Sequence, residues 1–425
     1  MSRETTILGY TITSDNLVRL CVFLFPIFAV SVRHWVSVIF VFLGVVAIFQ
    51  YVRKRNLAAP LFKEEKTLLI IMAASFVVYL LSSAANGWGK PAFYALGTES
   101  RFLLFIPLYF LLRELPGLSR NLFFGCVFGV FVALLQALYD VYVQDIGRAN
   151  GYYGPLFIGP VTVIFALLIL STQVGFVFRF KKTVLTLIAV AATVVAALAV
   201  ARSAFFVCVV ALIFLFSLAA PNWRILIAKI VGSLVIVVAA WMLSSQLRDV
   251  GNKTFTEFSD YYTFFMKHPD QPNPYGHGSA GVRLEMLRSV QYFLQESPIL
   301  GVGRYNYSLY AKKYSEQGKV NPAVAEHGHP HNVFAEALVS KGLLGFVVVV
   351  LMFFYPLYIF IRDFRKSRTS ARAGIYFIST ILIVMQTDNA VIIMGNFVAV
   401  FLLLLAVLFS WHINSVKQLP INTSC

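Results

Sequence analysis

Three histidines in a polar stretch late in the chain are the residues best suited to acid–base chemistry. His327, His329 and His331 alternate with a glycine and a proline. Histidine titrates near neutral pH, so a neutral imidazole can take a proton from a reacting hydroxyl. His331 is the best placed, because it comes directly before an apolar block and should lie at the level of the lipid headgroups. We expect His331 to act as a general base.

The same histidines could instead be metal ligands, because three imidazoles suffice to bind Zn²⁺. A fourth histidine, His277, lies upstream. However, the run includes Gly and Pro, and neither a carboxylate nor a cysteine is paired with it. We therefore expect no metal site. The cysteines have no ligand spacing and predict no disulfide; they are Cys21, Cys126, Cys208 and Cys425.

Arginines elsewhere in the chain could bind an anionic group, because a guanidinium is always charged and can hold two phosphate oxygens at once. Arg283 opens an amphipathic segment, and a helix N-terminus there would itself favour an anion. Arg202 stands between two apolar blocks on a face otherwise poor in basic residues, and Arg148 is a weaker third candidate. The plainer alternatives are an exposed side chain for Arg283 and, for Arg202, a helix-end arginine that reaches toward the headgroups.

Two other features are weaker candidates for a role in the site. Asp388 lies near the outer end of an apolar block, where an ionisable residue is either functional or paired with a neighbouring arginine. Gly301-Val302-Gly303 looks like part of a nucleotide-binding loop. It lacks the preceding strand and the remaining glycines of that motif, so we interpret it as a turn.

The composition identifies a membrane protein. Of the 425 residues, 59% are hydrophobic and only 13% are charged, whereas soluble domains carry about 25% charged residues. The net charge is +16, which in a soluble protein would suggest nucleic-acid binding. Here most Lys and Arg residues lie in short loops between apolar blocks, so the positive charge is better explained by membrane topology.

The hydrophobic pattern predicts an all-α integral membrane protein with about 12 transmembrane helices, because one span needs about 20 apolar residues. The fourth apolar block is short and has Pro107 in its middle, which predicts a short or broken helix. The blocks are about 17–33, 35–52, 67–85, 101–113, 122–143, 156–178, 183–201, 204–220, 225–244, 342–361, 374–393 and 396–413.

The polar stretch between the ninth and tenth blocks divides the chain into three parts. Residues 1–244 hold helices 1–9, residues 245–332 form one large loop domain, and residues 333–425 hold helices 10–12 and a tail. The loop should be partly helical, with Ser279 as an N-cap of a helix that stops at Ser297-Pro298. A second short helix is expected from Tyr307 to Tyr314.

Basic residues in the short loops predict the orientation in the membrane. One set of loops carries 15 Lys and Arg residues, and the opposite set carries five, namely Arg33, Lys90, Arg101, Arg148 and Arg202. The richer set should be cytoplasmic. Both termini would then lie inside, and the loop 245–332 would lie outside, in the periplasm of a Gram-negative cell.

Taken together, these motifs resemble those of the bacterial O-antigen ligases, whose relatives are the O-antigen polymerases and the protein O-oligosaccharyltransferases. His331-Asn332, nine further residues and then Gly342-x-x-Gly345 is similar to the signature of that superfamily. Arg202-Ser203 at a helix end resembles the family's arginine there. Further similar elements are Arg148-x-x-Gly151, Gly281-Val282-Arg283-Leu284-Glu285 and the segment from Ser297-Pro298 to Gly303.

The resemblance implies a function and a set of roles. The donor would be a glycan on undecaprenyl diphosphate, and the acceptor a sugar hydroxyl of lipid A-core, with inversion at the transferred sugar. Arg202 and Arg283, with Arg148, would hold the diphosphate, and His331 would activate the acceptor. Asn332, Gly342, Gly345 and Asp388 would support the site. No cofactor and no metal would be needed, and the enzyme would lie in the inner membrane with its site on the periplasmic face.

Two alternatives remain open on the sequence. A polymerase would use the same lipid-linked donor, and the motifs do not separate it from a ligase. A twelve-helix transporter has a suitable helix count, but its main central loop should follow the sixth block, and the two halves of the chain show no repeat. Transport of a labelled solute into vesicles without glycan transfer would favour the transporter.

The charge asymmetry predicts the outcome of a topology experiment. A periplasmically active reporter fused after Gln271 should be active, because that position lies in the loop expected outside. The same reporter fused after Lys366 should be inactive, and a cytoplasmic reporter at that position should be active. The opposite pattern would overturn the predicted orientation and with it the external placement of His331.

Overall fold

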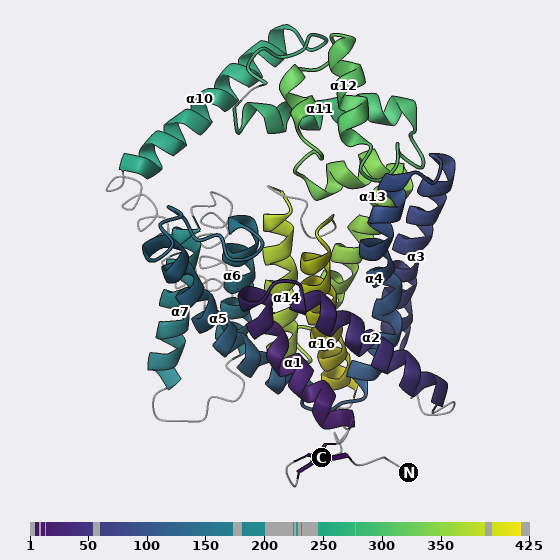
Figure 1. Ribbon diagram of the computed structural model, residues 1–425, viewed down its shortest axis with the longest axis vertical. Helices are drawn as coiled ribbons and strands as arrows, with labels where there is room; N and C mark the ends of the chain where they lie inside the picture. The colour runs from purple at the N-terminus through teal and green to yellow at the C-terminus, as the bar shows by residue number, and fades with distance from the viewer. Residues whose placement is uncertain are drawn as a thin grey trace.

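The computed structural model describes a helical bundle with a helical head at one end (Figure 1). The described residues are 5–7, 10–12, 14–53, 60–172, 181–199, 224, 227, 231, 245–276, 278–386 and 393–417. Within them, an all-helical architecture is confirmed apart from one short antiparallel hairpin, β1 (Thr5–Ile7) and β2 (Tyr10–Ile12).

The bundle contains ten apolar helices in the described part of the chain, and eight of these are long and apolar enough to cross a membrane. Of the other two, α7 has a shorter apolar stretch, Thr183–Leu198, and α14 has 17 residues. Their bounds are α1 (Ser14–Ser31), α2 (Trp35–Arg53), α3 (Lys63–Ala85), α4 (Lys90–Arg113), α5 (Leu118–Tyr142), α6 (Pro155–Thr172), α7 (Lys181–Leu198), α13 (Val333–Arg362), α14 (Arg368–Val384) and α16 (Gly395–Lys417). The predicted spans 204–220 and 225–244 lie outside the described residues, apart from single positions, so the number twelve stays a prediction.

The fourth helix is longer than the sequence predicted. The expected short helix at 101–113 is wrong, because α4 begins at Lys90, with Pro91 in its first turn, and Pro107 lies inside a continuous helix. The apolar pattern missed its first half because that half carries Glu99 and Arg101. Arg101 therefore lies within the helix and donates to the hydroxyl of Ser37 at 3.2 Å, so its placement in an outer loop was also wrong.

The polar stretch forms the head, which consists of α10 (Ser245–Lys267), α11 (Gly281–Glu296), α12 (Tyr307–Glu316) and the 3₁₀ helix η1 (Pro322–Glu326). Figure 1 shows the head at one end of the bundle and both chain termini at the other. The predicted placement of the termini on one side of the membrane and of the loop on the other stays a prediction. The two predicted helices of the loop are present as α11 and α12.

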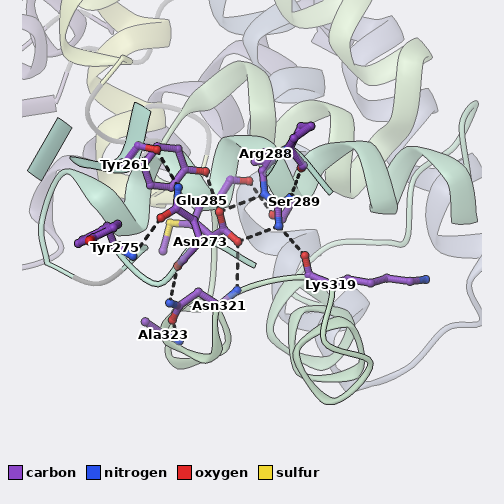
Figure 2. A network of polar contacts seen from close by, with 11 residues as sticks. Tyr261, Asn273, Tyr275, Glu285, Arg288, Ser289, Lys319, Asn321 and Ala323 are labelled. Carbon is purple, nitrogen blue, oxygen red and sulfur yellow. Dashed lines mark hydrogen bonds and ion pairs between the residues drawn. The ribbon is translucent and has the colours of Figure 1, made fainter. Parts of the chain in front are cut away.

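The head is held together by a buried carboxylate (Figure 2). Glu285 on α11 is fully buried and accepts hydrogen bonds from Tyr261 Oη at 2.7 Å, Arg288 Nε at 3.1 Å and the backbone N–H of Asn321 at 3.1 Å. Asn273 extends the network by donating to the carbonyl of Tyr261 at 2.8 Å. A buried carboxylate is tolerated when it is paired and hydrogen-bonded, so this network fixes α10, α11 and the turn before η1 to each other.

The start of α11 differs from the sequence expectation in one detail. Ala280, not Ser279, is the residue that precedes the helix, and its backbone N–H donates to Glu257 on α10 at 2.9 Å. Ser279 instead accepts a hydrogen bond from the side chain of Arg283 at 3.3 Å. A carboxylate near a helix N-terminus is favourable because of the partial positive charge there. Glu257 therefore helps to fix where α11 begins.

A sharp break at Gly342 divides α13 into an outer segment, Val333–Lys341, and a longer inner segment. Gly342 has φ 63° and ψ −158°, which is not helical. The outer segment has two packed faces. Ala335 and Val339 belong to the core of the head, whereas Val333 and Ala337 belong to the core of the bundle. The outer segment thus joins the two cores.

The loop from Pro298 to Gly303 fills this break with its own backbone. The N–H groups of Val302 and Gly303 donate to the carbonyls of Val339 at 2.8 Å and Ser340 at 3.2 Å. In return, Leu343 N–H donates to the Pro298 carbonyl at 2.9 Å. Backbone groups freed by a break must find partners if they are buried, and this loop supplies them.

Glycine is required on both sides of this contact. A Cβ on Gly342 would lie 2.4 Å from the carbonyl carbon and oxygen of Ile299, and a Cβ on Gly301 would lie 2.5 Å from Lys341 N. Both glycines have positive φ, which disfavours any side chain. Gly342 therefore allows the inserted loop to pack closely against α13. A Cβ on Gly345 would meet the Lys341 side chain at 2.2 Å, within the same kinked helix.

We predict that Gly342→Ala destabilises the protein by at least about 2 kcal/mol, because it combines backbone strain with a collision against the inserted loop. Gly97→Ala is the matched control, since Gly97 lies in α4 and a Cβ at that position would meet nothing within 4 Å. Thermal unfolding in detergent should show a lower midpoint for Gly342→Ala and little change for Gly97→Ala. Equal midpoints would contradict the proposed packing at the break.

Candidate active site

The three predicted histidines lie together in a tight turn between η1 and α13. The ring centroids of His329 and His331 are 4.3 Å apart, and those of His327 and His331 are 5.4 Å apart. His331 has φ 48°, a left-handed conformation that is uncommon for a residue with a side chain and often marks functional sites. The rings of His327 and His329 therefore both pack against that of His331.

Asn332 fixes the position of this turn at the N-terminus of α13. It is the N-cap residue, and its Oδ1 accepts hydrogen bonds from the backbone N–H groups of Phe334 at 2.9 Å and Ala335 at 3.1 Å. Asparagine is among the strongest N-cap residues because it satisfies N–H groups that the helix cannot. Asn332 directly follows His331. Its N-cap hydrogen bonds therefore attach the histidine turn to the outer segment of α13.

Two of the histidines are kept neutral by their surroundings. Burial, with smaller contributions from electrostatic interactions with His329 and Arg283, lowers the pKa of His331 to about 3. Burial, with charge on His327 and Arg304, lowers the pKa of His329 to about 4. A buried imidazole disfavours its charged form. At neutral pH both rings are therefore unprotonated, as a proton acceptor must be.

The structure brings Arg283 and His331 into one electrostatic environment. Arg283 is half-buried near the start of α11, and its charge acts on the imidazole of His331. These residues are 48 positions apart in the chain. The head therefore places a cation within electrostatic range of a neutral base, an arrangement suited to an anionic leaving group and a hydroxyl nucleophile.

Arg148 lies in a loop that is firmly anchored although its own side chain is exposed. The buried carboxylate of Asp140 accepts hydrogen bonds from the N–H groups of Asn150 at 2.9 Å and Gly151 at 2.7 Å. The N–H of Ala149 donates to the carbonyl of Leu198, at the end of α7, at 2.8 Å. The loop thus lies at the end of the helix that leads, four residues later, to Arg202.

Three residues named from the sequence lie outside the described residues: Arg202, Asp388 and His277. Their expected roles are not tested. Among the described residues, no group of three or more His, Cys, Asp or Glu side chains is arranged to hold a metal ion. The expectation of a site without metal stays a prediction.

The sequence analysis missed a buried chain of four charges next to the histidine turn. Arg304 is 3% exposed and lies 3.2 Å from Glu336 and 3.7 Å from Glu99. Lys341 lies 2.8 Å from the other oxygen of Glu99. Glu99 belongs to α4, and Glu336 and Lys341 belong to the outer segment of α13. Arg304 directly follows the loop that fills the break. Charged residues within or beside apolar blocks were the available signal.

This chain of charges connects the break in α13 to the histidines. Two acidic and two basic side chains balance, which makes their burial tolerable. Lys341 directly precedes Gly342, and Arg304 directly follows the inserted loop. The charge of Arg304 also acts on His329. The ion pairs therefore hold the outer segment of α13, and the histidine turn before it, against α4.

The fold and the site define a class of protein. It is a multi-pass helical membrane protein whose polar head places a neutral histidine and an arginine at one end of the bundle. Comparison with known proteins is consistent with this description. Residues 185–350 match the family model described as O-Antigen ligase, and the match supports membership of that superfamily.

The matched segment includes α11, the inserted loop, the histidine turn and the outer segment of α13. The resemblance predicted from the motifs is therefore confirmed. An uncharacterized protein of Haemophilus influenzae is 23% identical over 321 residues, covering 73% of this chain and 76% of that protein. The family match supports a glycosyltransferase-like function of the O-antigen ligase and polymerase type.

The depressed pKa values predict how stability depends on pH. In the unfolded chain a histidine titrates near 6.5, whereas in the folded protein His331 titrates at about 3 and His329 at about 4. Between these values the unfolded state binds more protons, so the stability that the two neutral histidines contribute is fully present above about pH 6.5. It is lost as the pH falls to about 4 for His329 and about 3 for His331. The thermal midpoint should fall over this window.

His331→Asn should flatten this pH dependence, because it removes one titrating ring, and Asn tolerates positive φ. His268→Asn, which changes an exposed histidine of the head, should leave the dependence unchanged. Thermal unfolding of the three proteins between pH 7.5 and pH 4.5 provides the measurement. An unchanged slope in His331→Asn would mean that its ring is not kept neutral by folding.

Proposed function

We propose that this protein is an O-antigen ligase, which moves a glycan from undecaprenyl diphosphate to a sugar hydroxyl of lipid A-core. The observation that carries the proposal is that a neutral, half-buried His331 lies within the electrostatic influence of Arg283, in a segment that matches the O-antigen ligase family. The head would lie on the periplasmic side of the inner membrane, with both termini in the cytoplasm.

The reaction balances with the groups at this site. The acceptor hydroxyl oxygen attacks the anomeric carbon of the donor sugar, and its proton passes to the imidazole of His331. The bond from that carbon to the diphosphate oxygen breaks, with inversion, and undecaprenyl diphosphate leaves as an anion. Arg283, with Arg202 and Arg148, would stabilise the negative charge that builds on this leaving group.

Donor binding would also make His331 a better base. A neutral imidazole with a pKa of about 3 is ready to accept a proton but has little affinity for it. A diphosphate bound beside Arg283 would neutralise the positive charge that lowers this pKa and would add negative charge nearby. Both effects raise the pKa of His331 toward neutral pH, where a general base is most effective.

The test is transfer by the purified protein in lipid vesicles. A polyprenyl-diphosphate-linked glycan is supplied with either a lipid A-core acceptor or a second lipid-linked repeat unit. We expect the wild type to use the core acceptor, and His331→Ala to lose 10²–10⁴-fold in rate, about the usual contribution of a general base. Arg283→Lys should restore little activity relative to Arg283→Ala, because lysine cannot bind two oxygens in one plane.

Each outcome distinguishes one alternative. Longer chains on the lipid carrier, with no transfer to the core acceptor, would identify a polymerase. Near-normal transfer by His331→Ala would remove it from the role of base. His327→Ala and His329→Ala are the matched controls for the turn, and we expect both to lose much less activity than His331→Ala.

A further inference from the structure

A pocket lined in part by Arg304 lies beside the loop that fills the break in α13. Its volume is about 330 Å³, and its lining residues come from the end of α3, the start of α4, the connection between them and residues 303–306. This size falls at the lower end of small-molecule sites. Its polar and aromatic lining residues include Asn86, Trp88, Arg304 and Asn306.

The charge balance of the pocket argues against an anionic ligand. Arg304 is its charged lining residue, and it is paired with Glu336 at 3.2 Å and Glu99 at 3.7 Å. Both carboxylates are almost fully buried. A guanidinium held between two carboxylates attracts little additional negative charge. The pocket therefore suits a neutral ligand, in contrast to the region around Arg283.

The side-chain amides of Asn86 and Asn306 donate hydrogen bonds through Nδ2, and their Oδ1 atoms can accept further ones. Asn86 Nδ2 donates to the carbonyls of Ser82 at 2.8 Å and Gly301 at 2.9 Å, and Asn306 Nδ2 donates to Val302 at 2.8 Å. Among the described residues, no hydrogen bond is found to the Oδ1 atom of either amide. Amide oxygens held in this way can accept from hydroxyl groups of a ligand.

Trp88 supplies an apolar surface beside these acceptors. The residue is 44% exposed, and its ring is held by Tyr79, edge to face, at 6.2 Å between centroids and by Phe93 at 5.7 Å. Indole combines a broad apolar face with one polar N–H. A ligand that fits must therefore offer both an apolar face and several hydroxyl groups, which describes a sugar ring.

We propose that this pocket binds a neutral sugar ring of a glycan substrate. The inference rests on the proposed function and adds a recognition site to it. Gly303, in the pocket, donates its N–H to the carbonyl of Ser340, and Ser340 lies nine residues after His331, about 13 Å of helix. The bound sugar is thus not the sugar that reacts. An oligosaccharide, rather than a monosaccharide, is needed to reach from the pocket to His331.

The sugar could belong to the acceptor or to the glycan of the donor, and kinetics with Trp88 variants separates these sources. Trp88→Ala should raise the KM for one of the two glycan substrates by about ten-fold with a smaller change in kcat, because the pocket lies away from the reacting bond. Trp88→Phe should restore most of the loss by keeping an aromatic face. Tyr94→Ala is the matched control, since Tyr94 is a 77% exposed aromatic residue on α4 that does not line the pocket.

A binding measurement makes the test independent of the proposed reaction. The probes are free core oligosaccharide and the free glycan released from the donor, titrated against the full-length protein by isothermal titration calorimetry. One probe should bind the wild type and bind Trp88→Ala about ten-fold more weakly, with thermal unfolding used to confirm that the variant is folded. Free monosaccharide should bind to the wild type without supporting transfer.

The outcomes separate the two proposals. If both free glycans bind the wild type and Trp88→Ala equally, and the KM values are also unchanged, the sugar pocket is wrong even when transfer is active. If one glycan binds through Trp88 but no transfer is found with either acceptor, the pocket stands and the proposed function fails. A rise in the KM of the acceptor alone assigns the pocket to the acceptor, and a rise for the donor alone assigns it to the donor glycan.

Discussion

The backbone groups freed at Gly342 are the constraint on which the rest of the site depends. A helix that breaks near the end of a membrane bundle exposes N–H and carbonyl groups that must be satisfied. Here the loop from Pro298 to Gly303 satisfies them with four backbone hydrogen bonds, to Val339 and Ser340 and from Leu343 and Leu344. The head is therefore joined to the bundle by shared backbone pairing, in addition to side-chain packing.

This joint determines where the chemistry can take place. The outer segment of α13 carries the histidine turn at its start and the break at its end, and it packs into the core of the head on one face and into the bundle on the other. Arg304, which follows the inserted loop, links Glu336 on the outer segment to Glu99 on α4. This one short helical segment thus determines where His331 lies. Because it packs against the head, it also helps to position Arg283. Its length sets the separation between the histidines and the Trp88 pocket.

Much of this could be predicted from the sequence, and the limits have physical causes. Apolar length located most of the described helices, because a bilayer span needs a fixed number of apolar residues. It failed at α4, where Glu99 and Arg101 interrupt the apolar pattern although both are accommodated inside the protein. The histidine motif pointed to His331, and local cues pointed to Asn332. The role of Gly342 and the ion pairs of Arg304 depend on contacts between residues far apart in the chain, which no local pattern encodes.

The most direct test of the account is a structure of the protein in lipid with an intact polyprenyl-diphosphate-linked glycan bound. The account predicts that the diphosphate lies at the junction of head and bundle, with phosphate oxygens hydrogen-bonded to Arg283 and the anomeric carbon facing the imidazole of His331. It also predicts that the Pro298–Gly303 loop remains in the break of α13. A diphosphate bound away from Arg283, with His331 out of reach of the sugar, would contradict the central claim.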